Sequence, residues 1–365
     1  RNLLDISAVL EALEQRRGVD RIPLLEDVRI LLDSLDGAID YASPEAKRAR
    51  LDRFLHGCAE GVSGRMVNVS TSALAADLRR KGRWILEHVR ASEWVTGRDG
   101  TGWFNGYYDN DGRRVESDDG SHVRMTLPGQ VFAVMSGAAT DEQVEQVLRS
   151  ADRHLWDDQV AGYRLNSDFK DADLKLGRCF GFAYGHKENG AMFCHMAVMF
   201  AYALYARGRA RAGYRILDTI HQHCRNFEVS RVYPGIPEYI NDRGRGMYPY
   251  LTGSASWYLF TLLTMAYGIR GELGDLLLRP QLLPEQFDGH DEASVQTQFA
   301  NRRLRVVYRN TQRKDAGAYR VRSITSAGRA IPFNDDDGGA LIKRSVISAL
   351  DLSLIHISEP TRPRL

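Results

Sequence analysis

The sequence of 365 residues has few cysteines and little net charge. The four cysteines show no paired spacing, so we expect neither a disulfide framework nor a metal site; they are Cys58, Cys179, Cys194 and Cys224. This usage fits a reducing compartment, and we expect a cytoplasmic protein. The formal net charge is +2 and no block of Lys and Arg stands out, which argues against a protein that binds nucleic acid or a membrane surface.

A long apolar run is also absent. The two longest, residues 191–206 and 257–269, fall short of the roughly 20 residues that a membrane-spanning helix needs, and His195 interrupts the first. The start of the chain has no signal-peptide layout, and no sequence repeat is visible. We therefore expect no membrane contact from this segment.

Both ends of the sequence predict a fragment of a longer protein. The chain begins at Arg1 rather than Met and is already in helical periodicity there. Residues 352–365 resemble a translated transposase adaptor from sequencing-library preparation. We expect a chain truncated at its N-terminus with a non-native tail. Sequencing of the native locus tests this, since a native continuation matching the tail would refute it.

Helical patterns dominate as far as Gly271. Ser43 followed by Pro44 predicts a capped helix start, and Thr140, two acidic residues and Gln143 predict another. Because short Gly-rich connections join many of these helices, consecutive ones are expected to pack as antiparallel neighbours. Apolar residues recur at helical spacing in residues 3–15, 24–35, 71–95, 209–223 and 254–267.

Strand patterns follow Gly271. Residues 276–284 are extended and punctuated by proline, and residues 293–299 and 303–308 alternate or are β-branched, with a turn expected at Asn301-Arg302. A further strand is expected at residues 318–324. The sequence thus predicts a β-rich module packed on a mainly α domain.

Residues 102–112, here called the aspartate loop, interleave aromatic rings with carboxylates. Rings such as Trp103 stack on the apolar faces of sugars, and carboxylates such as Asp109 and Asp111 bind hydroxyls or donate a proton. A calcium loop would need its first ligand at Tyr107, so that match fails. An Asx-rich turn without catalytic function is the remaining alternative.

A second polar cluster stands directly before the apolar run 191–206, which predicts a fully buried helix. It consists of Lys187, Glu188 and Asn189, and His195 lies about one turn inside the helix. Helix N-termini attract anions because their N–H groups are unpaired. Lys187 adds positive charge, while Glu188 and Asn189 can bind sugar hydroxyls. The alternative is a capped helix with a satisfied core histidine.

A third cluster combines two stretches of the chain. Residues 233–239 contain Glu238, and Thr252 with Gly253 directly precedes the apolar helix predicted over 254–267. A hydroxyl beside the free N–H groups of a helix start suits phosphate. An ordinary N-cap is the alternative.

Together these motifs resemble glycoside hydrolase family 94, the inverting glycoside phosphorylases, which include cellobiose and chitobiose phosphorylases. The resemblance rests on the aspartate loop and on residues 187–195 and 250–257, and it covers about residues 103–288. Residues 107–112 and 233–239 look closer to the β-1,2-glucan branch. That branch holds the 1,2-β-oligoglucan phosphorylases and the phosphorylase domain of cyclic β-1,2-glucan synthases.

The resemblance implies an (α/α)6 barrel followed by a C-terminal β-sandwich-like domain. We place the barrel, incomplete at its N-terminus, at residues 1–271, the partial β-domain at 272–351 and the tail at 352–365. The family also leads us to expect an oligosaccharide and inorganic phosphate as ligands, with no cofactor, and it allows a homodimer.

The resemblance further implies sugar-binding roles. The family's sugar-contacting Lys-Glu pair matches Lys187 and Glu188, and its upstream aromatic matches Phe182, where relatives can carry Tyr. Trp103 and Glu238 are the other candidates for contact with the sugar.

The family's phosphate-binding residues match His195 and Thr252 with Gly253, whereas a phosphate-binding Arg of the family has no counterpart that we can place in this chain. Phosphate is already anionic, so attack on the sugar needs no base and one carboxylic acid suffices. An inverting hydrolase, in contrast, needs two carboxylates roughly 6.5–9.5 Å apart.

Asp109 and Asp111 compete for the role of the acid. Relatives with Trp-Asn-Asp-Gly carry the acid directly before Gly, which points to Asp111. The carboxylate of an Asp-Gly turn, however, is often consumed by backbone bonds, whereas the rings of Tyr107 and Tyr108 would desolvate Asp109, as a proton donor requires. These considerations favour Asp109 and keep both as candidates.

The main hypothesis is a phosphorylase that converts a β-linked glucooligosaccharide, with β-1,2-glucan as the expected substrate, and phosphate into α-glucose 1-phosphate and a shortened chain. One alternative is an inverting hydrolase on the same barrel with Glu238 or Glu188 as base. Another is a non-catalytic or chain-length-setting domain of a cyclic β-1,2-glucan synthase.

Overall fold

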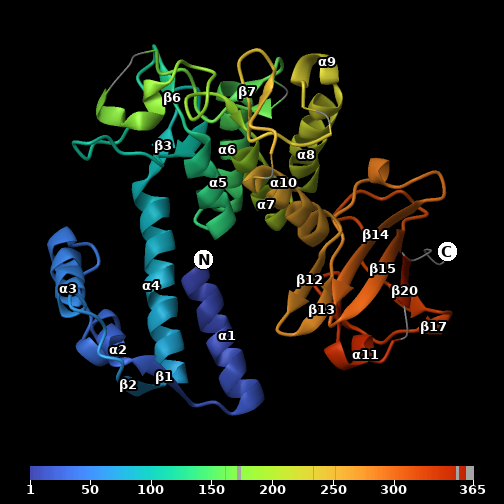
Figure 1. Ribbon diagram of the computed structural model, residues 1–365, viewed down its shortest axis with the longest axis horizontal. Coiled ribbons are helices and arrows are strands. Elements are labelled where there is room, and N and C mark those ends of the chain that lie inside the picture. Colours follow the sequence, from blue (N-terminus) through green and yellow to red (C-terminus); the bar gives the residue numbers. More distant parts are fainter. Residues whose placement is uncertain (161, 171–173, 233, 251, 351–352, 359–365) are drawn as a thin grey trace. The chain divides into compact units, whose positions relative to one another are not determined.

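The structure is a computed structural model that describes residues 1–160, 162–170, 174–232, 234–250, 252–350 and 353–358 (Figure 1). It contains two compact units, Arg1–Ser92 and Glu93–Leu365, and each is described by itself. This division differs from the predicted one after Gly271, although the change from helices to sheets does fall close to that residue, at Ile269. The predicted boundaries at residues 271 and 351 stay predictions.

In the first unit a pair of helices carries a small two-stranded sheet. α1 (Asn2–Arg17) packs along α4 (Thr71–Ser92) (Figure 1). The helix predicted over 71–95 is confirmed as far as Ser92, whereas Trp94 and Val95 belong to a strand. β1 (Arg21–Leu25) pairs antiparallel with β2 (Met66–Ser70). The apolar core of this unit contains Leu10, Leu32, Val69, Leu74 and Ala75.

Three helical segments lie between the two strands: the 3-10 helix η1 (Glu26–Leu31), α2 (Asp33–Asp36) and α3 (Pro44–Gly57). The continuous helix predicted over residues 24–35 is wrong, because its first two residues belong to β1 and satisfy their backbone groups by pairing with β2. Ser43 caps α3 as predicted, and its hydroxyl oxygen accepts a backbone N–H of the first turn at 3.1 Å.

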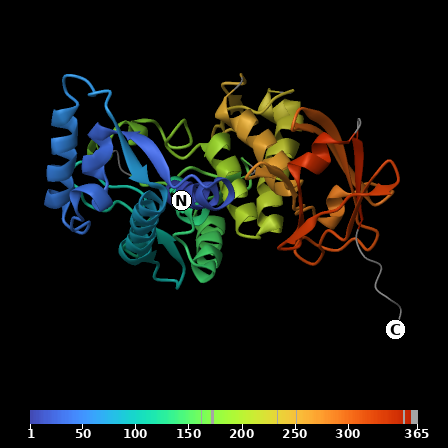
Figure 2. The same ribbon diagram turned by 90° about the horizontal axis from the view of Figure 1, so that it is seen from below.

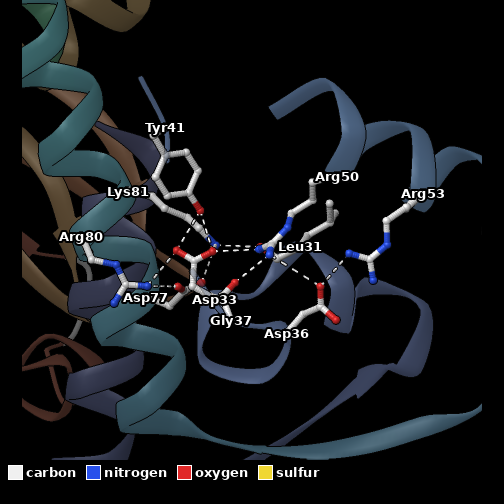
Figure 3. A network of polar contacts seen from close by, with 10 residues as sticks. All are labelled: Leu31, Asp33, Asp36, Gly37, Tyr41, Arg50, Arg53, Asp77, Arg80 and Lys81. Carbon is white, nitrogen blue, oxygen red and sulfur yellow. Dashed lines mark hydrogen bonds and ion pairs between the residues drawn. The ribbon is translucent and has the colours of Figure 1, made fainter. Parts of the chain in front are cut away.

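A buried ionic network joins α2, α3 and α4 (Figure 3). The Asp33 side chain is 1% exposed and accepts hydrogen bonds from Tyr41 Oη at 2.7 Å, Arg50 Nη1 at 3.0 Å and Arg80 Nη2 at 2.9 Å. Asp77, whose side chain is fully buried, shares Arg80 at 2.6 Å. Because each buried carboxylate has cationic partners, the network is compatible with burial.

In the second unit, α7 (Cys194–Ala206) is the central helix. It packs against α5 (Leu127–Ser136), α8 (Ala210–Arg225) and α10 (Gly253–Thr261), and these helices lie together in Figures 1 and 2. Neighbours on several sides explain why residues 191–206 are apolar all round. The mainly α character of this part is as predicted, and a closed (α/α)6 ring stays a prediction.

The sequence predicted α6 of this unit but did not predict α5. α6 (Asp141–His154) begins with a capping box, in which Thr140 and Gln143 exchange hydrogen bonds of 3.0 and 3.2 Å. α5 was not expected, because Pro128 and Gly129 in its first turn are typical of a loop. Across the part of the chain that the structure describes, no helix is long and apolar enough to span a membrane.

Two larger sheets follow the helices. The first has the order β12-β13-β19-β18 and contains β12 (Ile269–Glu272), β13 (Asp275–Leu278), β19 (Gly339–Ile342) and β18 (Asn334–Asp336). The second has the order β14-β15-β20-β16-β17 and contains β14 (Glu292–Phe299), β15 (Arg302–Arg309), β20 (Ser353–Ser358), β16 (Ser323–Ser326) and β17 (Arg329–Ala330).

Shorter elements complete the second unit. They are the strand pairs β3 (Trp94–Thr96) with β4 (Gly102–Phe104), β5 (Ser117–Asp118) with β6 (Val123–Arg124) and β7 (Trp156–Asp157) with β8 (Gly162–Tyr163), the set β9 (Met192–Phe193), β10 (Tyr239–Ile240) and β11 (Gly246–Met247), and the helical turns η2 (Leu174–Leu176), η3 (Arg178–Gly181), α9 (Phe227–Ser230), η4 (Leu262–Ala266), η5 (Pro284–Gln286) and α11 (Arg344–Ser348).

The strands predicted around residue 300 are confirmed, with corrections. The turn lies one residue earlier than expected, at Ala300 and Asn301, whose φ angles of 50° and 61° match a type I′ hairpin. Only the end of the strand predicted over 318–324 is strand, from Ser323 onward.

Part of the predicted tail belongs to the fold. Residues 353–358 form β20, which pairs with β15 and β16. Without this strand, β15 and β16 would each present an unpaired edge, which readily accepts another strand. The non-native origin of the tail stays a prediction, and residues 352 and 359–365 lie outside the described ones.

Candidate active site

Two helix N-termini meet at the candidate site. His195 lies in the first turn of α7, and Gly253 opens α10. A Cβ atom at Gly253 would lie 2.5 Å from His195 Cε1, so the imidazole packs directly on the Gly253 backbone. Only glycine allows this contact. The structure therefore brings together two of the residues predicted to bind phosphate.

The environment of His195 suits a neutral imidazole that binds a ligand. Its Nε2 is buried and has no hydrogen-bond partner among the described residues. Burial lowers the pKa of His195 below its ordinary value, and the charge of Glu238 opposes this in part. The backbone oxygen of Glu238 accepts the N–H of Cys194 at 2.9 Å, which holds the Glu238 segment at the start of α7. An unsatisfied buried nitrogen costs about 1–3 kcal/mol, which a bound oxyanion would recover.

Thr252 is the N-cap of α10, as the alternative reading proposed. Its Oγ1 accepts the N–H of Ser254 at 3.2 Å. Capping does not exclude phosphate binding, because a hydroxyl that accepts one hydrogen bond still donates its own proton. Tyr233 and Leu251 of the predicted motifs lie outside the described residues.

Lys187 occupies a tight turn before α7. Its φ of 48° lies in the left-handed region, which costs of order 1 kcal/mol for a residue with a side chain and persists only where the surroundings hold it. Its Nζ lies 5.0 Å from the Phe182 ring centroid and 5.8 Å from that of Tyr248. Lys187 of the predicted Lys-Glu pair is therefore in contact with Phe182, the aromatic predicted upstream of it.

The two residues after Lys187 differ in what they leave free. Glu188 Oε1 accepts from Arg178 at 3.1 Å, and its Oε2 is buried without a partner among the described residues. Asn189 donates to the Phe182 backbone oxygen at 2.7 Å and accepts from Asn166 at 3.1 Å. Asn189 thus holds the turn together, whereas Glu188 keeps one oxygen for a hydroxyl.

The two candidate acids of the aspartate loop have unlike partners. Asp109 Oδ1 accepts the backbone N–H groups of Asp111 at 2.9 Å and Arg113 at 2.8 Å, which is an Asx turn. Asp111 pairs with Lys175 Nζ at 2.6 Å, and its side chain is 43% exposed. This corrects the reasoning that favoured Asp109, since the backbone bonds of the loop occupy that residue. The identity of the acid stays a prediction.

Trp103 lies in the core. The residue is 0% exposed in β4, and its ring centroid lies 5.9 Å from that of His154. This position corrects the expectation of a sugar-stacking Trp103, because the indole has no exposed face to offer a pyranose.

Side-chain contacts connect the aspartate loop to the turn at Lys187. The Tyr107 ring centroid lies 5.6 Å from that of Phe180, and the Tyr107 hydroxyl donates to the backbone oxygen of Leu176. Arg178 of the same segment binds Glu188. The segment from residue 175 to 182 therefore stands between the predicted acid and the predicted sugar-binding pair.

Further contacts continue to the helix N-termini. The ring of Tyr248, next to Lys187, lies 5.7 Å from that of Tyr239, and Tyr239 lies 6.3 Å from Phe193. Phe193 is the second residue before His195. The predicted acid loop and the predicted phosphate site thus belong to one connected cluster of the second unit, bridged by side chains.

Sequence reasoning missed a buried carboxylate at the base of the aspartate loop. Glu116 is 3% exposed, and its carboxylate accepts from Thr126 Oγ1 at 2.6 Å, Thr126 N at 2.9 Å and Gly106 N at 2.8 Å. Burial raises its pKa to about 7, although the hydrogen bonds from Thr126 and Gly106 oppose the rise. The polar sequence around it gave no sign of burial.

Replacing Glu116 with Gln is expected to remove a pH dependence of stability. Because the folded state raises the pKa from 4.5 to about 7, Glu116 favours folding below about pH 4.5 and loses that contribution as the pH rises to 7. The change amounts to about 3 kcal/mol, since one pKa unit corresponds to about 1.4 kcal/mol. Urea unfolding between pH 4.5 and 8 measures it, with the exposed Glu272→Gln as control; an unaltered profile in Glu116→Gln would contradict the assignment.

The chain has recognisable relatives. A family profile described as "Glycosyl hydrolase 94 superfamily, catalytic domain" matches residues 73–268. Solabiose phosphorylase of Paenibacillus borealis is 25% identical, over 69% of this chain and 33% of its own length. N,N'-diacetylchitobiose phosphorylase of Vibrio proteolyticus is 25% identical, over 63% of this chain and 29% of its own. Cyclic beta-(1,2)-glucan synthase NdvB of Rhizobium meliloti is 24% identical, over 60% of this chain and 8% of its own. The chain thus spans a third or less of the length of these relatives.

Proposed function

This chain belongs to the glycosyl hydrolase 94 superfamily, and from that premise we propose that it carries the catalytic domain of an inverting glycoside phosphorylase. The substrates are a β-linked glucooligosaccharide and inorganic phosphate, and the products are α-glucose 1-phosphate and a shortened chain. No cofactor is required. The observation that carries the proposal is the contact of His195 with Gly253 at two helix N-termini, with His195 Nε2 free for a ligand.

The chemistry divides between two ends of the cluster. At one end His195, Thr252 and the N–H groups of α10 bind phosphate and aim one of its oxygens at the anomeric carbon. At the other end a carboxylic acid of the aspartate loop protonates the leaving glycosidic oxygen. Attack from the face opposite the leaving group inverts the configuration. Lys187 and Glu188 hold the glucosyl hydroxyls between the two ends.

The β-1,2 linkage is the finer part of the proposal. It is supported by the motif at residues 107–112 and by similarity to a protein named as a cyclic β-1,2-glucan synthase, while the other relatives are named for different saccharides. We propose β-1,2-linked oligoglucans as the preferred substrate on these grounds.

A product assay tests the activity. The protein encoded by the intact gene is incubated with β-1,2-, β-1,3- and β-1,4-linked glucooligosaccharides, with and without inorganic phosphate, and glucose 1-phosphate and glucose are measured separately. We expect α-glucose 1-phosphate only when phosphate is present, and fastest from the β-1,2 series. Glucose release without phosphate would support the inverting hydrolase instead, and the absence of both products would support a non-catalytic domain.

Gly253→Ala should weaken phosphate binding. The new methyl group would displace the His195 ring, and a misplacement of about 1 Å at a reacting centre can cost about 10²-fold in rate. We expect the KM for phosphate to rise about tenfold or more, with the KM for the oligosaccharide little changed. Gly289→Ala is the matched control, because nothing lies within 4 Å of its Cβ position. Equal effects of both substitutions would remove Gly253 from the phosphate site.

A further inference from the structure

We propose that the second unit contains an additional oxyanion-binding site, in a cavity remote in sequence from the motifs of the candidate active site. The cavity has a volume of about 490 Å³. It lies where the segment after β13, the connection from α7 to α8, the loop before β16 and the turn between β18 and β19 come together. The helical part and the sheets both contribute to its walls.

The walls carry an excess of positive charge. Arg279, Lys314, Arg320 and Arg322 line the cavity, and Asp337 is its one acidic lining residue. In the described part of the chain, the side chains of Lys314, Arg320 and Arg322 form neither an ion pair nor a hydrogen bond. Three cations without an ion-pair partner therefore line the cavity, and its one acidic residue, Asp337, lies near Arg279 rather than near them.

Arg279, the fourth cation of the cavity, has ion-pair partners and also a donor atom that is left free. Its Nη2 binds Asp336 at 2.6 Å, and its Nη1 lies 3.8 Å from Asp337, whose side chain is 91% exposed. Its Nε is buried and has no partner among the described residues. An N–H group left free in this way, next to three unpaired cations, indicates a missing acceptor.

In a neighbouring cavity of about 440 Å³, carboxylates balance the positive charge of the lining arginines. It is also lined by arginines, but each has a carboxylate: Arg209 pairs with Glu145, Arg211 with Glu285 at 3.0 Å, and Arg215 with an aspartate at 2.9 Å. The difference singles out the larger cavity.

The chemistry of the walls fits a ligand with several anionic oxygens. Arginine binds phosphate and carboxylate through parallel N–H groups, and a cluster of cations in a concavity raises the local concentration of anions. Gly317, at φ 84°, has nothing within 4 Å of its Cβ position, so the backbone there is open to a ligand. Inorganic phosphate and the phosphoryl group of a sugar phosphate share this chemistry.

Calorimetric titration tests the site without any need for turnover. Phosphate and glucose 1-phosphate are titrated, at constant ionic strength set with chloride, into a His195→Ala background that disables the proposed catalytic phosphate site. We expect one bound oxyanion, and Arg320→Gln/Arg322→Gln should weaken it at least tenfold. Binding of phosphate alone identifies the free anion as sufficient, and binding of glucose 1-phosphate alone identifies the sugar phosphate; both support the site.

The matched control removes the same charge elsewhere. Arg303 and Arg305 are exposed on β15, form no side-chain interaction among the described residues and do not line the cavity. Arg303→Gln/Arg305→Gln should leave the affinity unchanged. No binding to the background protein, or an equal loss in both double variants, would overturn the proposal. Loss of phosphorolysis in the product assay with this binding intact would refute the proposed function and leave the oxyanion site standing.

Discussion

Asp111→Asn in the intact protein is expected to lower kcat for phosphorolysis of natural oligosaccharides by about 10²–10⁴-fold, the contribution typical of a general acid. The carboxylate of Asp111 is reached from solvent and is held by a side chain, Lys175, that a substrate can displace. Asparagine keeps the size of the residue and removes the transferable proton. The KM for phosphate should change little, because the residues proposed to bind phosphate lie at the other end of the cluster.

Asp109→Asn is the matched comparison and should retain most of the activity. The amide oxygen of asparagine can still accept the backbone N–H groups of Asp111 and Arg113, so the loop keeps its shape. Asp109→Ala removes these bonds and should cost more than Asp109→Asn. A substrate with a good leaving group, such as an aryl glucoside, needs less protonation and should recover much of the loss in Asp111→Asn. Comparable retained activity in both asparagine variants would remove the loop from the mechanism, and a larger loss in Asp109→Asn would identify Asp109 as the acid.

Asp33→Ala is expected to destabilise the first unit by about 3–5 kcal/mol, the cost of removing one partner of a buried ion pair. The substitution leaves the guanidinium of Arg50, whose side chain is 9% exposed, and the hydroxyl of Tyr41 without their shared acceptor (Figure 3). Asp36→Ala is the control. The Asp36 side chain is 29% exposed, binds Arg53, which is 61% exposed, and lies 3.6 Å from Arg50 Nη2. Because Arg50 Nη2 keeps the Gly37 backbone oxygen as an acceptor, the loss of Asp36 should cost about 1 kcal/mol.

Hydrogen exchange of α3 and α4 together with urea unfolding measures the effect of Asp33→Ala. Burial by itself raises the pKa of Asp33, but hydrogen bonds from Tyr41 and Arg80 and the charge of Lys81 outweigh it and hold the pKa below its ordinary value. The stabilisation is therefore present above about pH 4 and is lost as the pH falls through the folded-state pKa. Asp33→Ala should show less acid sensitivity below pH 4 than the parent protein. Similar costs for Asp33→Ala and Asp36→Ala would contradict a buried, charge-dependent network.

The sequence by itself determined the features that depend only on residues close together in the chain, such as helix caps. The cap at Ser43 and the capping box at Thr140 involve residues within one turn of each other, so their geometry follows from the chain alone. The apolar run of α7 predicted a buried helix with neighbours on several sides, because a helix that is apolar all round must be covered on every face. The sequence also indicated the family, because the resemblance depends on short motifs and on their order along the chain.

Tertiary structure decided the features that depend on contacts between segments distant in sequence, such as strand pairing and burial. Pairing with β2 turned residues 24 and 25 into strand, although their spacing also suits a helix. Packing put Trp103 in the core, although its loop suggested a ring that stacks on sugar. Packing also put Glu116 in a site shielded from water, where its pKa rises, although polar residues surround it in sequence. The Gly253 contact with His195 joins residues 58 positions apart, and the basic cavity gathers four separate connections. Burial and charge balance are properties of the space around a side chain, and neighbours in sequence supply only a small part of that space.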